Sequence, residues 1–310
     1  MKTVLMTGSS GFLGRHLKKK LISKGVEVIS IDSKSIDLTK DSDLNKIPNK
    51  EYDHIFHLAA WTRAGNFCEH FGGDQYLKNV AINTNILKWW LNNSQNAKFI
   101  GLGTSVSYSE GFSLCEENYM LGIPYDKFYA YAMSKRILYS GLKALNKQYG
   151  LKYLFLIPST LYGPDYHADG RDLHFIYDLI RKIARKHYYN EDITLWGDGL
   201  QKRELVHVND FIEILIKLNE ITENEIFNIG AGEEHSIKEF ASIICNYFNI
   251  DENEIKYNTK AYVGAKSKIL STNKLNLCIP NFEKTKLEYG IKETISWMIN
   301  SEYFKTNKFN

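Results

Sequence analysis

Residues 7–14 read Thr-Gly-Ser-Ser-Gly-Phe-Leu-Gly, and this stretch decides the fold. The apolar run Thr3–Thr7 before it suits a buried strand, and Phe12–Ser23 has apolar residues at helical spacing. The three glycines of residues 7–14 allow a tight turn, close approach of the backbone to a pyrophosphate, and close packing of helix on strand. Because N–H groups at a helix N-terminus attract phosphate, the stretch predicts a strand–turn–helix unit that binds a dinucleotide.

Outward from this turn, apolar runs and amphipathic segments alternate. Strands are expected at Thr3–Thr7, Val26–Ile31, His54–Leu58, Lys98–Leu102 and Lys152–Ile157, and helices at Phe12–Ser23, Leu77–Asn92 and Tyr131–Tyr149. This alternation predicts an α/β fold, a doubly wound parallel Rossmann sheet with helices on both faces.

The pattern becomes less regular after Gly163-Pro164. Helices are expected at His174–Arg185, Ser236–Phe248 and Thr285–Ile299, and a strand at Ile226–Ile229 that returns to the sheet. We therefore expect a dinucleotide-binding domain over residues 1–162, joined by residues 204–230. A smaller, interleaved α/β substrate domain is expected over residues 163–310, without residues 204–230.

Composition and charge exclude several classes of partner. The 310 residues are 44% hydrophobic and 24% charged, as in an ordinary globular protein. Their net charge of +3 gives no case for a nucleic-acid or membrane partner, and no apolar stretch approaches the ~20 residues of a membrane span. Four cysteines without a CxxC pair or zinc spacing, and an N-terminal apolar run that Gly8 interrupts, favour reduced thiols, a cytoplasmic location and no metal.

An acidic residue, Asp32, ends the second expected strand. A carboxylate there would bind the adenosine ribose hydroxyls and repel a 2′-phosphate, which favours NAD(H) over NADP(H). Ser33 and Lys34 beside it are able to accept a phosphate, so NADP(H) stays possible, and Asp32 also suits a simple turn. Asp37 and Leu38 follow at a distance that would reach the adenine.

Tyr131 and Lys135 begin a long expected helix with YxxxK spacing, which puts both side chains on one face. A tyrosine of ordinary pKa near ~10 is a poor acid–base group, and a neighbouring ammonium together with a nicotinamide cation would lower that pKa. Thr104-Ser105 ends the fourth expected strand, where a hydroxyl would hold a substrate oxygen against Tyr131. The pattern indicates hydride-transfer chemistry.

Taken together, these motifs resemble the extended short-chain dehydrogenase/reductases, in the NAD-dependent epimerase/dehydratase family that acts on sugar nucleotides. The motifs are Gly8/Gly11/Gly14, His57-Leu58-Ala59-Ala60, Asn83, Thr104-Ser105, Tyr131/Lys135, Leu161-Tyr162-Gly163-Pro164 and the run Arg203-Glu204-Leu205-Val206-His207-Val208-Asn209-Asp210. Within that family the chain is most similar to the GDP-fucose synthases. The resemblance implies a catalytic triad of Thr104, Tyr131 and Lys135, with Asn83 structural rather than catalytic.

The resemblance also implies the binding residues. Those for the cofactor are Gly8, Ser10, Gly11, Phe12, Leu13, Gly14, Asp32, Asp37, Leu38, Leu58, Ala59, Ala60, Tyr131, Lys135 and Pro158. Those for the substrate are Ser105, Val106, His174, Trp196, Arg203 and Lys268. Arg203 would pair with a diphosphate and Trp196 would pack on the guanine base. The plainer alternatives are an ordinary helix histidine, a core tryptophan and a solvated arginine.

One departure from the family limits the chemistry. Val106 stands where GDP-fucose synthases carry the cysteine of epimerisation, and Ser105-Val106 stands where 4,6-dehydratases carry two acids. Because a valine cannot move a proton, both activities are disfavoured, although Cys115 in the following loop is a remote substitute. The reaction that these residues still allow is hydride transfer at carbon 4 of the sugar, which needs only the nicotinamide and the triad.

The expected function is therefore that of a sugar-nucleotide 4-ketoreductase without 3,5-epimerase activity. It would act on a GDP-linked 4-keto hexose or heptose in surface-polysaccharide biosynthesis. The alternatives are a 4-epimerase or 4-dehydrogenase that retains NAD, and a non-catalytic dinucleotide sensor. By the same resemblance, residues 77–92 and 131–149 would form a homodimer interface, to which Trp89 and Trp90 are suited.

Overall fold

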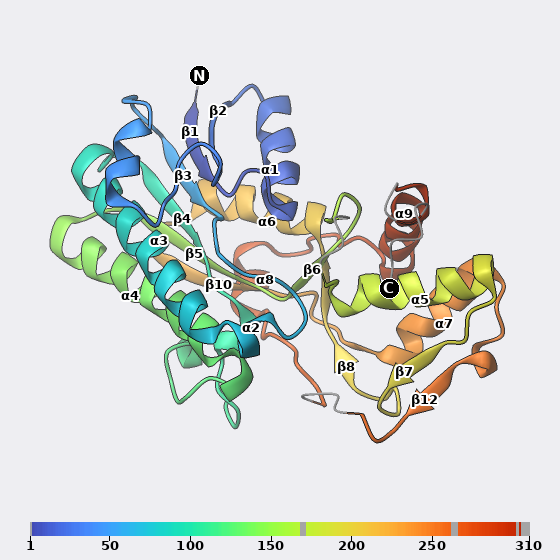
Figure 1. Cartoon of the computed structure of the whole chain (residues 1–310). Helices are drawn as coiled ribbons and strands as arrows, with labels where there is room; N and C mark the ends of the chain where they lie inside the picture. Colours follow the sequence, from blue (N-terminus) through green and yellow to red (C-terminus); the bar gives the residue numbers. More distant parts are fainter. Residues whose placement is uncertain (1, 168–171, 262–265, 302–303, 305–310) are drawn as a thin grey trace. The chain divides into compact units, whose positions relative to one another are not determined.

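The structure, a computed structural model, describes residues 2–167, 172–261, 266–301 and 304 (Figure 1). The chain divides into two compact units. Unit 1 contains Met1–Pro158, Phe211–Ile229 and Ser271–Asn281. Unit 2 contains Ser159–Asp210, Gly230–Leu270 and Phe282–Asn310. Each unit is thus built from three separate stretches of sequence.

A parallel sheet of six strands forms the centre of unit 1, in the order β10-β5-β4-β3-β1-β2. The strands are β1 (Thr3–Thr7), β2 (Glu27–Ile31), β3 (His54–His57), β4 (Lys98–Leu102), β5 (Tyr153–Pro158) and β10 (Glu225–Ile229). Every neighbouring pair is parallel. From β1 the chain goes first to β2 on one side and then to β3, β4 and β5 on the other. The predicted doubly wound α/β fold is confirmed.

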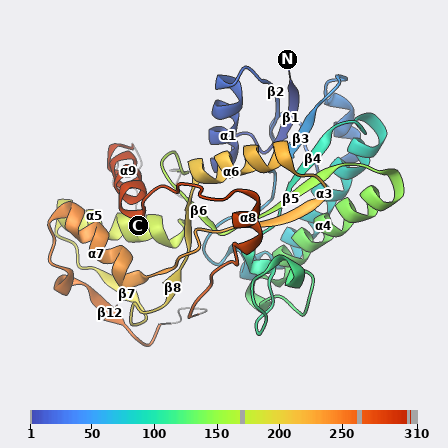
Figure 2. The same cartoon turned by 180° about the vertical axis from the view of Figure 1, so that it is seen from behind.

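Helices cover both faces of this sheet (Figures 1 and 2). On one face lie α1 (Phe12–Ser23) and α6 (Val208–Ile221), which the ion pair Lys20–Glu213 joins. On the other lie α3 (Gly72–Asn93) and α4 (Tyr129–Tyr149). Two short helices, α2 (Phe67–His70) and α8 (Asn273–Cys278), belong to the same unit.

In the part of unit 2 that the structure describes, α-helices pack with short two-stranded pairs. The helices are α5 (Phe175–Tyr189), α7 (Ile237–Phe248) and α9 (Leu287–Asn300). The pairs join β6 (Thr160–Tyr162) to β9 (Leu205–His207), β7 (Thr194–Trp196) to β12 (Lys256–Asn258), and β8 (Lys202–Arg203) to β11 (His235–Ser236). A reciprocal capping box between Ser236 and Glu239 fixes the start of α7.

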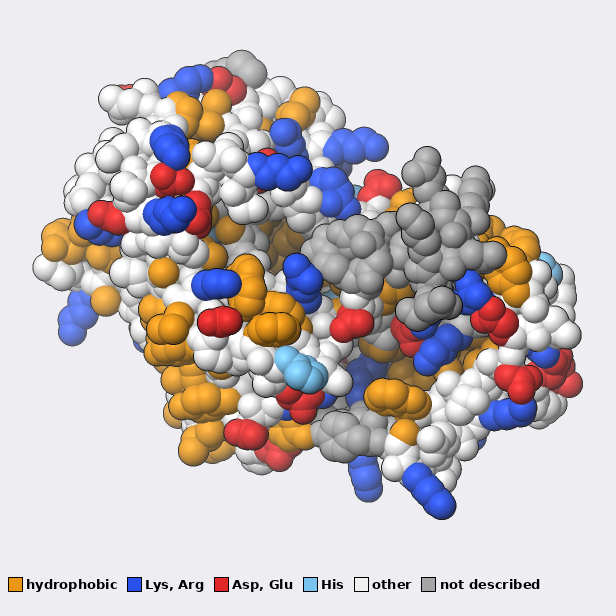
Figure 3. All heavy atoms as spheres, viewed as in Figure 1, with side chains coloured by type: hydrophobic (Ala, Val, Ile, Leu, Met, Phe, Trp, Pro, Cys, Tyr) orange, Lys and Arg blue, Asp and Glu red, His pale blue; other side chains and the backbone are white. Residues whose placement is uncertain are grey.

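Trp89 and Trp90 are not interface residues of the kind the sequence suggests, because both are buried, with exposed fractions of 7% and 0%. Trp90 packs on Phe99 and donates to the carbonyl of Ala97 at 2.9 Å. Exposed apolar side chains lie instead at the starts of α3 and α4 and in the loop before α4: Tyr76, Leu77, Met120, Leu121, Ile123 and Tyr129. Figure 3 shows hydrophobic side chains gathered in the region of α4 and this loop. Among the described residues, no helix has both the length and the apolarity needed to cross a membrane.

Candidate active site

The glycine-rich turn after β1 is packed too closely for side chains. Gly8 has a φ of +68°, and a Cβ there would lie 2.7 Å from the backbone nitrogen of Ala59. A Cβ on Gly14 would overlap the carbonyl oxygen of Gly8. Gly11 is the N-cap of α1, and it has no side chain with which to cap the first N–H groups of the helix. The turn therefore presents bare backbone at a helix N-terminus, which fits a dinucleotide pyrophosphate.

Several predicted site residues meet at the carboxyl edge of the sheet, because each ends a parallel strand or follows it within two residues. These are Gly8 after β1, Asp32 after β2, Leu58 after β3, Thr104 after β4 and Pro158 at the end of β5. The turn that carries Ser10, Phe12 and Leu13 and the segment Leu58–Ala60 lie side by side, as the close approach of Gly8 to Ala59 requires.

An open pocket lies between the turn, α1 and β2. Its lining includes Ser9, Ser10, Arg15, Lys18, Lys19 and Asp32. Asp32 Oδ1 accepts hydrogen bonds from the backbone of Ser35 and Lys34, at 3.1 Å and 3.0 Å, and these bonds hold its pKa below the usual value. The three basic residues of this pocket, Arg15, Lys18 and Lys19, are not among the cofactor-binding residues that the sequence predicts. Their i, i+3, i+4 spacing on α1 is the signal that would have identified them.

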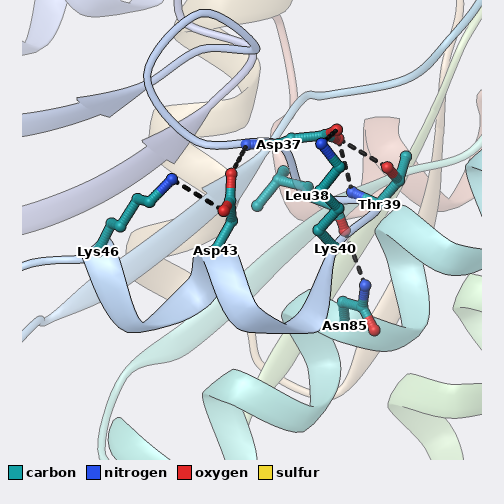
Figure 4. A network of polar contacts seen from close by, with 7 residues as sticks. All are labelled: Asp37, Leu38, Thr39, Lys40, Asp43, Lys46 and Asn85. Carbon is teal, nitrogen blue, oxygen red and sulfur yellow. Dashed lines mark hydrogen bonds and ion pairs between the residues drawn. The ribbon is translucent and has the colours of Figure 1, made fainter.

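Asp37 and Leu38 have roles inside the fold (Figure 4). Asp37 Oδ1 accepts hydrogen bonds from the backbone and hydroxyl of Thr39, at 3.1 Å and 2.7 Å, which lower its pKa. Leu38 is buried, and its carbonyl accepts a hydrogen bond from Asn85 of α3 at 2.9 Å. The bond from Asn85 ties the β2–β3 connection to α3. Contact of Asp37 or Leu38 with the cofactor stays a prediction.

A buried polar chain runs from the glycine-rich turn to α4. Thr7 Oγ1 lies 2.9 Å from His57 Nδ1, and His57 Nε2 lies 3.1 Å from Asn83 Oδ1. Asn83 then donates to the carbonyl of Ser134, one residue before Lys135, at 3.0 Å. Burial lowers the pKa of His57 to about 3, so its ring is neutral at physiological pH. The chain fixes α4 relative to the ends of β1 and β3.

Tyr131 and Lys135 lie on α4 with the Lys135 Nζ atom 5.8 Å from the Tyr131 ring centroid. Lys135 is 3% exposed, and burial lowers its pKa to about 8. Burial also raises the pKa of Tyr131 above its usual value, with a further contribution from Cys68 of α2. In the protein without cofactor the pKa of Tyr131 is therefore raised, and its lowering by Lys135 together with a nicotinamide cation stays a prediction. The proximity of Cys68 had no signal in the sequence, because α2 is far from α4 along the chain.

Thr104 and the two residues after it are half-buried and lead into a short 3-10 turn, η2 (Ser105–Ser107). Thr104 Oγ1 accepts a hydrogen bond from the backbone of Val106 at 3.4 Å. The hydroxyl of Ser107 donates to the carbonyl of Ala132 on α4 at 3.2 Å. The structure thus brings Thr104–Val106 against the helix that carries Tyr131 and Lys135.

The pH dependence of catalysis should reveal Lys135. Because its pKa is near 8 in the free protein, its ammonium is lost as pH rises through that value, and kcat/KM for the expected hydride transfer should fall above pH 8. In Lys135→Arg the charge persists, so the basic limb should disappear from the measured range. A limb at the same pH in both proteins would assign it to another group.

In unit 2, Arg203 of β8 and Lys268 are close enough to interact electrostatically. Burial, followed by the charge of Arg203, lowers the pKa of Lys268 to about 7. The buried carboxylate of Glu204 accepts hydrogen bonds from the backbone of Gly232 at 2.9 Å and of Leu270 at 3.1 Å. Glu204 therefore holds the Lys268 segment beside Arg203. The structure thus brings two half-buried cations, both predicted substrate residues, close to one another.

His174 and Trp196 also lie in unit 2. His174 is the exposed N-cap residue of α5, which begins one residue later than expected, and its ring centroid lies 6.0 Å from that of Tyr166. Trp196 is 63% exposed on β7, so it is not a core residue. Within the described part of the chain, no cluster of His, Cys, Asp or Glu is arranged to hold a metal ion.

Comparison with known proteins places this geometry in a family. The family model described as "NAD dependent epimerase/dehydratase family" matches residues 4–230. GDP-L-fucose synthase of Sinorhizobium fredii is 27% identical, covering 97% of this chain and 96% of that protein. A dTDP-4-dehydro-6-deoxy-D-allose reductase of a Streptomyces species is 24% identical, covering 96% of each chain.

A GDP-L-fucose synthetase from Naegleria fowleri bound to NADP has the same fold, with a TM-score of 0.85 at 23% identity, covering 99% of this chain and 96% of that one. The chain belongs to the NAD-dependent epimerase/dehydratase family of extended short-chain dehydrogenase/reductases, and it is an NAD(P)-dependent enzyme of the oxidoreductase/epimerase type.

Proposed function

We propose that the protein is a sugar-nucleotide 4-ketoreductase that reduces carbon 4 of a GDP-linked 4-keto sugar and lacks 3,5-epimerase activity. The observation that carries this proposal is the combination of Tyr131, Lys135 and Thr104 around one helix with a valine at position 106. Relatives named as a GDP-L-fucose synthase and a dTDP-sugar reductase support the sugar-nucleotide class. Surface-polysaccharide biosynthesis is the setting that we propose for it.

The residues of unit 1 supply the proton. When bound, the reduced nicotinamide supplies the hydride. Tyr131 donates its proton to the oxygen on carbon 4, and the raised pKa keeps this hydroxyl protonated at neutral pH, the form that a reductase needs. The Lys135 ammonium stabilises the phenolate that remains. Thr104 donates a hydrogen bond to the same sugar oxygen and orients it.

The segment after Thr104 explains the proposed absence of epimerisation. Removal of a proton from a carbon beside the ketone needs a positioned base, and Val106 has none. The same residues would serve a 4-epimerase or a 4-dehydrogenase, which carry out the hydride step without a separate base. These two activities are the alternatives that the assay below separates from reduction.

We propose that unit 2 holds the nucleotide. Arg203 and Lys268 bind the diphosphate, since two adjacent cations match its two negative charges. The exposed indole of Trp196 stacks on the base, and His174 contacts a sugar hydroxyl. The homodimer through residues 77–92 and 131–149 is part of the same proposal, and sedimentation velocity measures it directly.

For the cofactor, we propose that Asp32 makes NADH the better donor while Arg15, Lys18 and Lys19 allow NADPH to bind. In the double variant Lys18→Gln/Lys19→Gln, KM for NADPH should rise about tenfold, and KM for NADH should stay within twofold. Lys24→Gln at the C-cap of the same helix is the matched control. Equal changes for both cofactors would show that the two lysines do not contact a 2′-phosphate.

The test of function is nicotinamide absorbance on mixing the purified protein with NADH or NADPH and a GDP-4-keto-6-deoxy hexose. We expect stoichiometric loss of the reduced cofactor and, in D₂O, no deuterium at carbons 3 and 5 of the product. Deuterium at either carbon would contradict the absence of epimerisation. No loss of reduced cofactor, with NAD bound to the purified protein, would favour the 4-epimerase or 4-dehydrogenase.

A further inference from the structure

Arg136 is a buried arginine on α4, immediately after Lys135, with an exposed fraction of 4%. Its guanidinium donates to the carbonyl of Ser107, from Nε at 3.1 Å and from Nη2 at 2.6 Å. It also donates to the carbonyls of Leu121, from Nη2 at 2.8 Å, and Gly122, from Nη1 at 2.7 Å. A longer contact of 3.3 Å reaches Ser109 Oγ.

These acceptors are all uncharged oxygens, and among the residues that the structure describes none forms an ion pair with Arg136. Burial lowers the pKa of Arg136, as expected for a cation that leaves water without an anionic partner. A buried charge is costly and persists where its hydrogen bonds do something that an apolar side chain cannot do. A planar guanidinium with five donors is able to join several carbonyls at once.

The carbonyls belong to the two ends of one loop. The chain leaves α4's neighbourhood through Ser107 and Ser109 and returns through Leu121 and Gly122. An isolated antiparallel bridge between Ser109 and Pro124 shows that the two ends lie side by side. Arg136 therefore closes the neck of this loop and fastens the neck to α4.

The outgoing end of the neck begins directly after the segment that faces the proposed substrate. Ser107 is bonded to α4 three times, because its carbonyl accepts two hydrogen bonds from Arg136 and its hydroxyl donates to the carbonyl of Ala132. The backbone N–H of Ser107 in turn donates to the carbonyl of Thr104 at 3.1 Å. The position of Thr104 relative to α4 thus depends on where Arg136 holds Ser107.

We propose that Arg136 is a positioning residue, which sets Thr104–Val106 at the distance from Tyr131 and Lys135 that proton transfer requires. This inference rests on the proposed reductase function for its kinetic consequence. Its structural consequence, that Arg136 keeps the backbone of Thr104–Ser107 in a fixed conformation, is independent of the proposed function. Arg136 touches no reacting atom and acts through Ser107.

The kinetic test is Arg136→Lys, which keeps the charge but cannot join three carbonyls. We expect kcat for the 4-keto sugar to fall roughly ten- to a hundredfold, as small misplacements of reacting groups do, with the Kd for NADH within twofold of wild type. The matched control is Tyr108→Phe, which removes the 2.7 Å bond from Tyr108 to Asn228 and loosens the same loop away from α4. Tyr108→Phe should lower Tm comparably and keep kcat within about twofold. An unchanged kcat in Arg136→Lys, or equal kcat losses at equal losses of Tm, would overturn the proposal.

Hydrogen exchange tests the same inference without the reaction. In Arg136→Met the amides of Val106 and Ser107, both bonded to Thr104, should exchange at least tenfold faster than in Tyr108→Phe. In Arg136→Ala, which removes the side chain beyond Cβ, methylguanidine should restore protection, and methylammonium at equal concentration should not. If wild-type protein reduces no 4-keto sugar, these exchange rates still decide the role of Arg136. Unchanged protection in Arg136→Met would reject it.

Discussion

Tyr131→Phe should lower kcat for ketone reduction by about 10²–10⁴-fold, the usual contribution of a positioned proton donor. The ring still fills its place on α4, so Tm and the Kd for NADH should stay near wild type. Burial keeps the Tyr131 hydroxyl protonated. In the proposed reaction, its loss removes the proton source for the oxygen on carbon 4. Steady-state kinetics with NADH and the 4-keto sugar measure the effect.

The control for this substitution is Tyr129→Phe, two positions earlier on the same helix. Tyr129 is an exposed tyrosine with no lysine four residues later, so removal of its hydroxyl should leave kcat unchanged. Equal activity in Tyr131→Phe and wild type would overturn the catalytic assignment and would favour the dinucleotide sensor. If Tyr131→Phe raises the Kd for NADH and leaves kcat unchanged, Tyr131 is a cofactor-binding residue only.

Lys268→Met should weaken binding of the nucleotide about 10- to 100-fold, because a hydrogen bond to a charged group contributes about 1.5–3 kcal/mol. Calorimetry with GDP as the probe measures Kd directly. In the wild-type protein, Kd should rise as pH increases above 7, because Lys268 loses its proton near that pH in the free protein. Binding at pH 7.5 should therefore take up part of a proton, which the buffer dependence of the enthalpy reports.

Lys266→Met is the matched control for Lys268→Met, since Lys266 is an exposed lysine two residues earlier in the same segment. It should change Kd for GDP by less than about twofold at physiological salt, where exposed charges are screened. If the two variants weaken GDP binding equally, the effect is one of net charge, and the proposed diphosphate site at Arg203 and Lys268 is wrong.

The sequence predicts the fold well where local pattern and tertiary structure agree. The strands of the sheet are short runs rich in apolar residues, and β1, α1 and β4 have the expected bounds. Helix α3 begins at Gly72 rather than at Leu77, because its packing outweighs the cost of about 1 kcal/mol for each glycine in a helix. Helix α6 is absent from the elements that the pattern predicts, since it follows β9 with no residue that breaks the chain.

The candidate site is predictable where one segment carries it. The glycine-rich turn and the YxxxK pair are local motifs, and both have the geometry their spacing requires. Contacts between segments have no such signal. Cys68 near Tyr131, Arg136 at the neck of the loop, and Glu204 beneath Lys268 each join elements that are distant in the sequence. Burial of a side chain also has no local signal in the sequence. The pKa of Tyr131 is raised by the surrounding fold and is not set by Lys135 one turn away on the same helix.

The order of the sheet has a consequence for the newly made chain. Strand β5 has fully buried Leu154, Phe155, Leu156 and Ile157, and one of its edges is paired only when β10 arrives from a later stretch of sequence. While residue 158 has left the ribosome and residue 229 has not, the nascent chain therefore exposes an apolar strand with unpaired backbone groups. Such a strand promotes aggregation. Chaperone occupancy during translation should peak in this interval, and a polypeptide that stops after β5 should be insoluble.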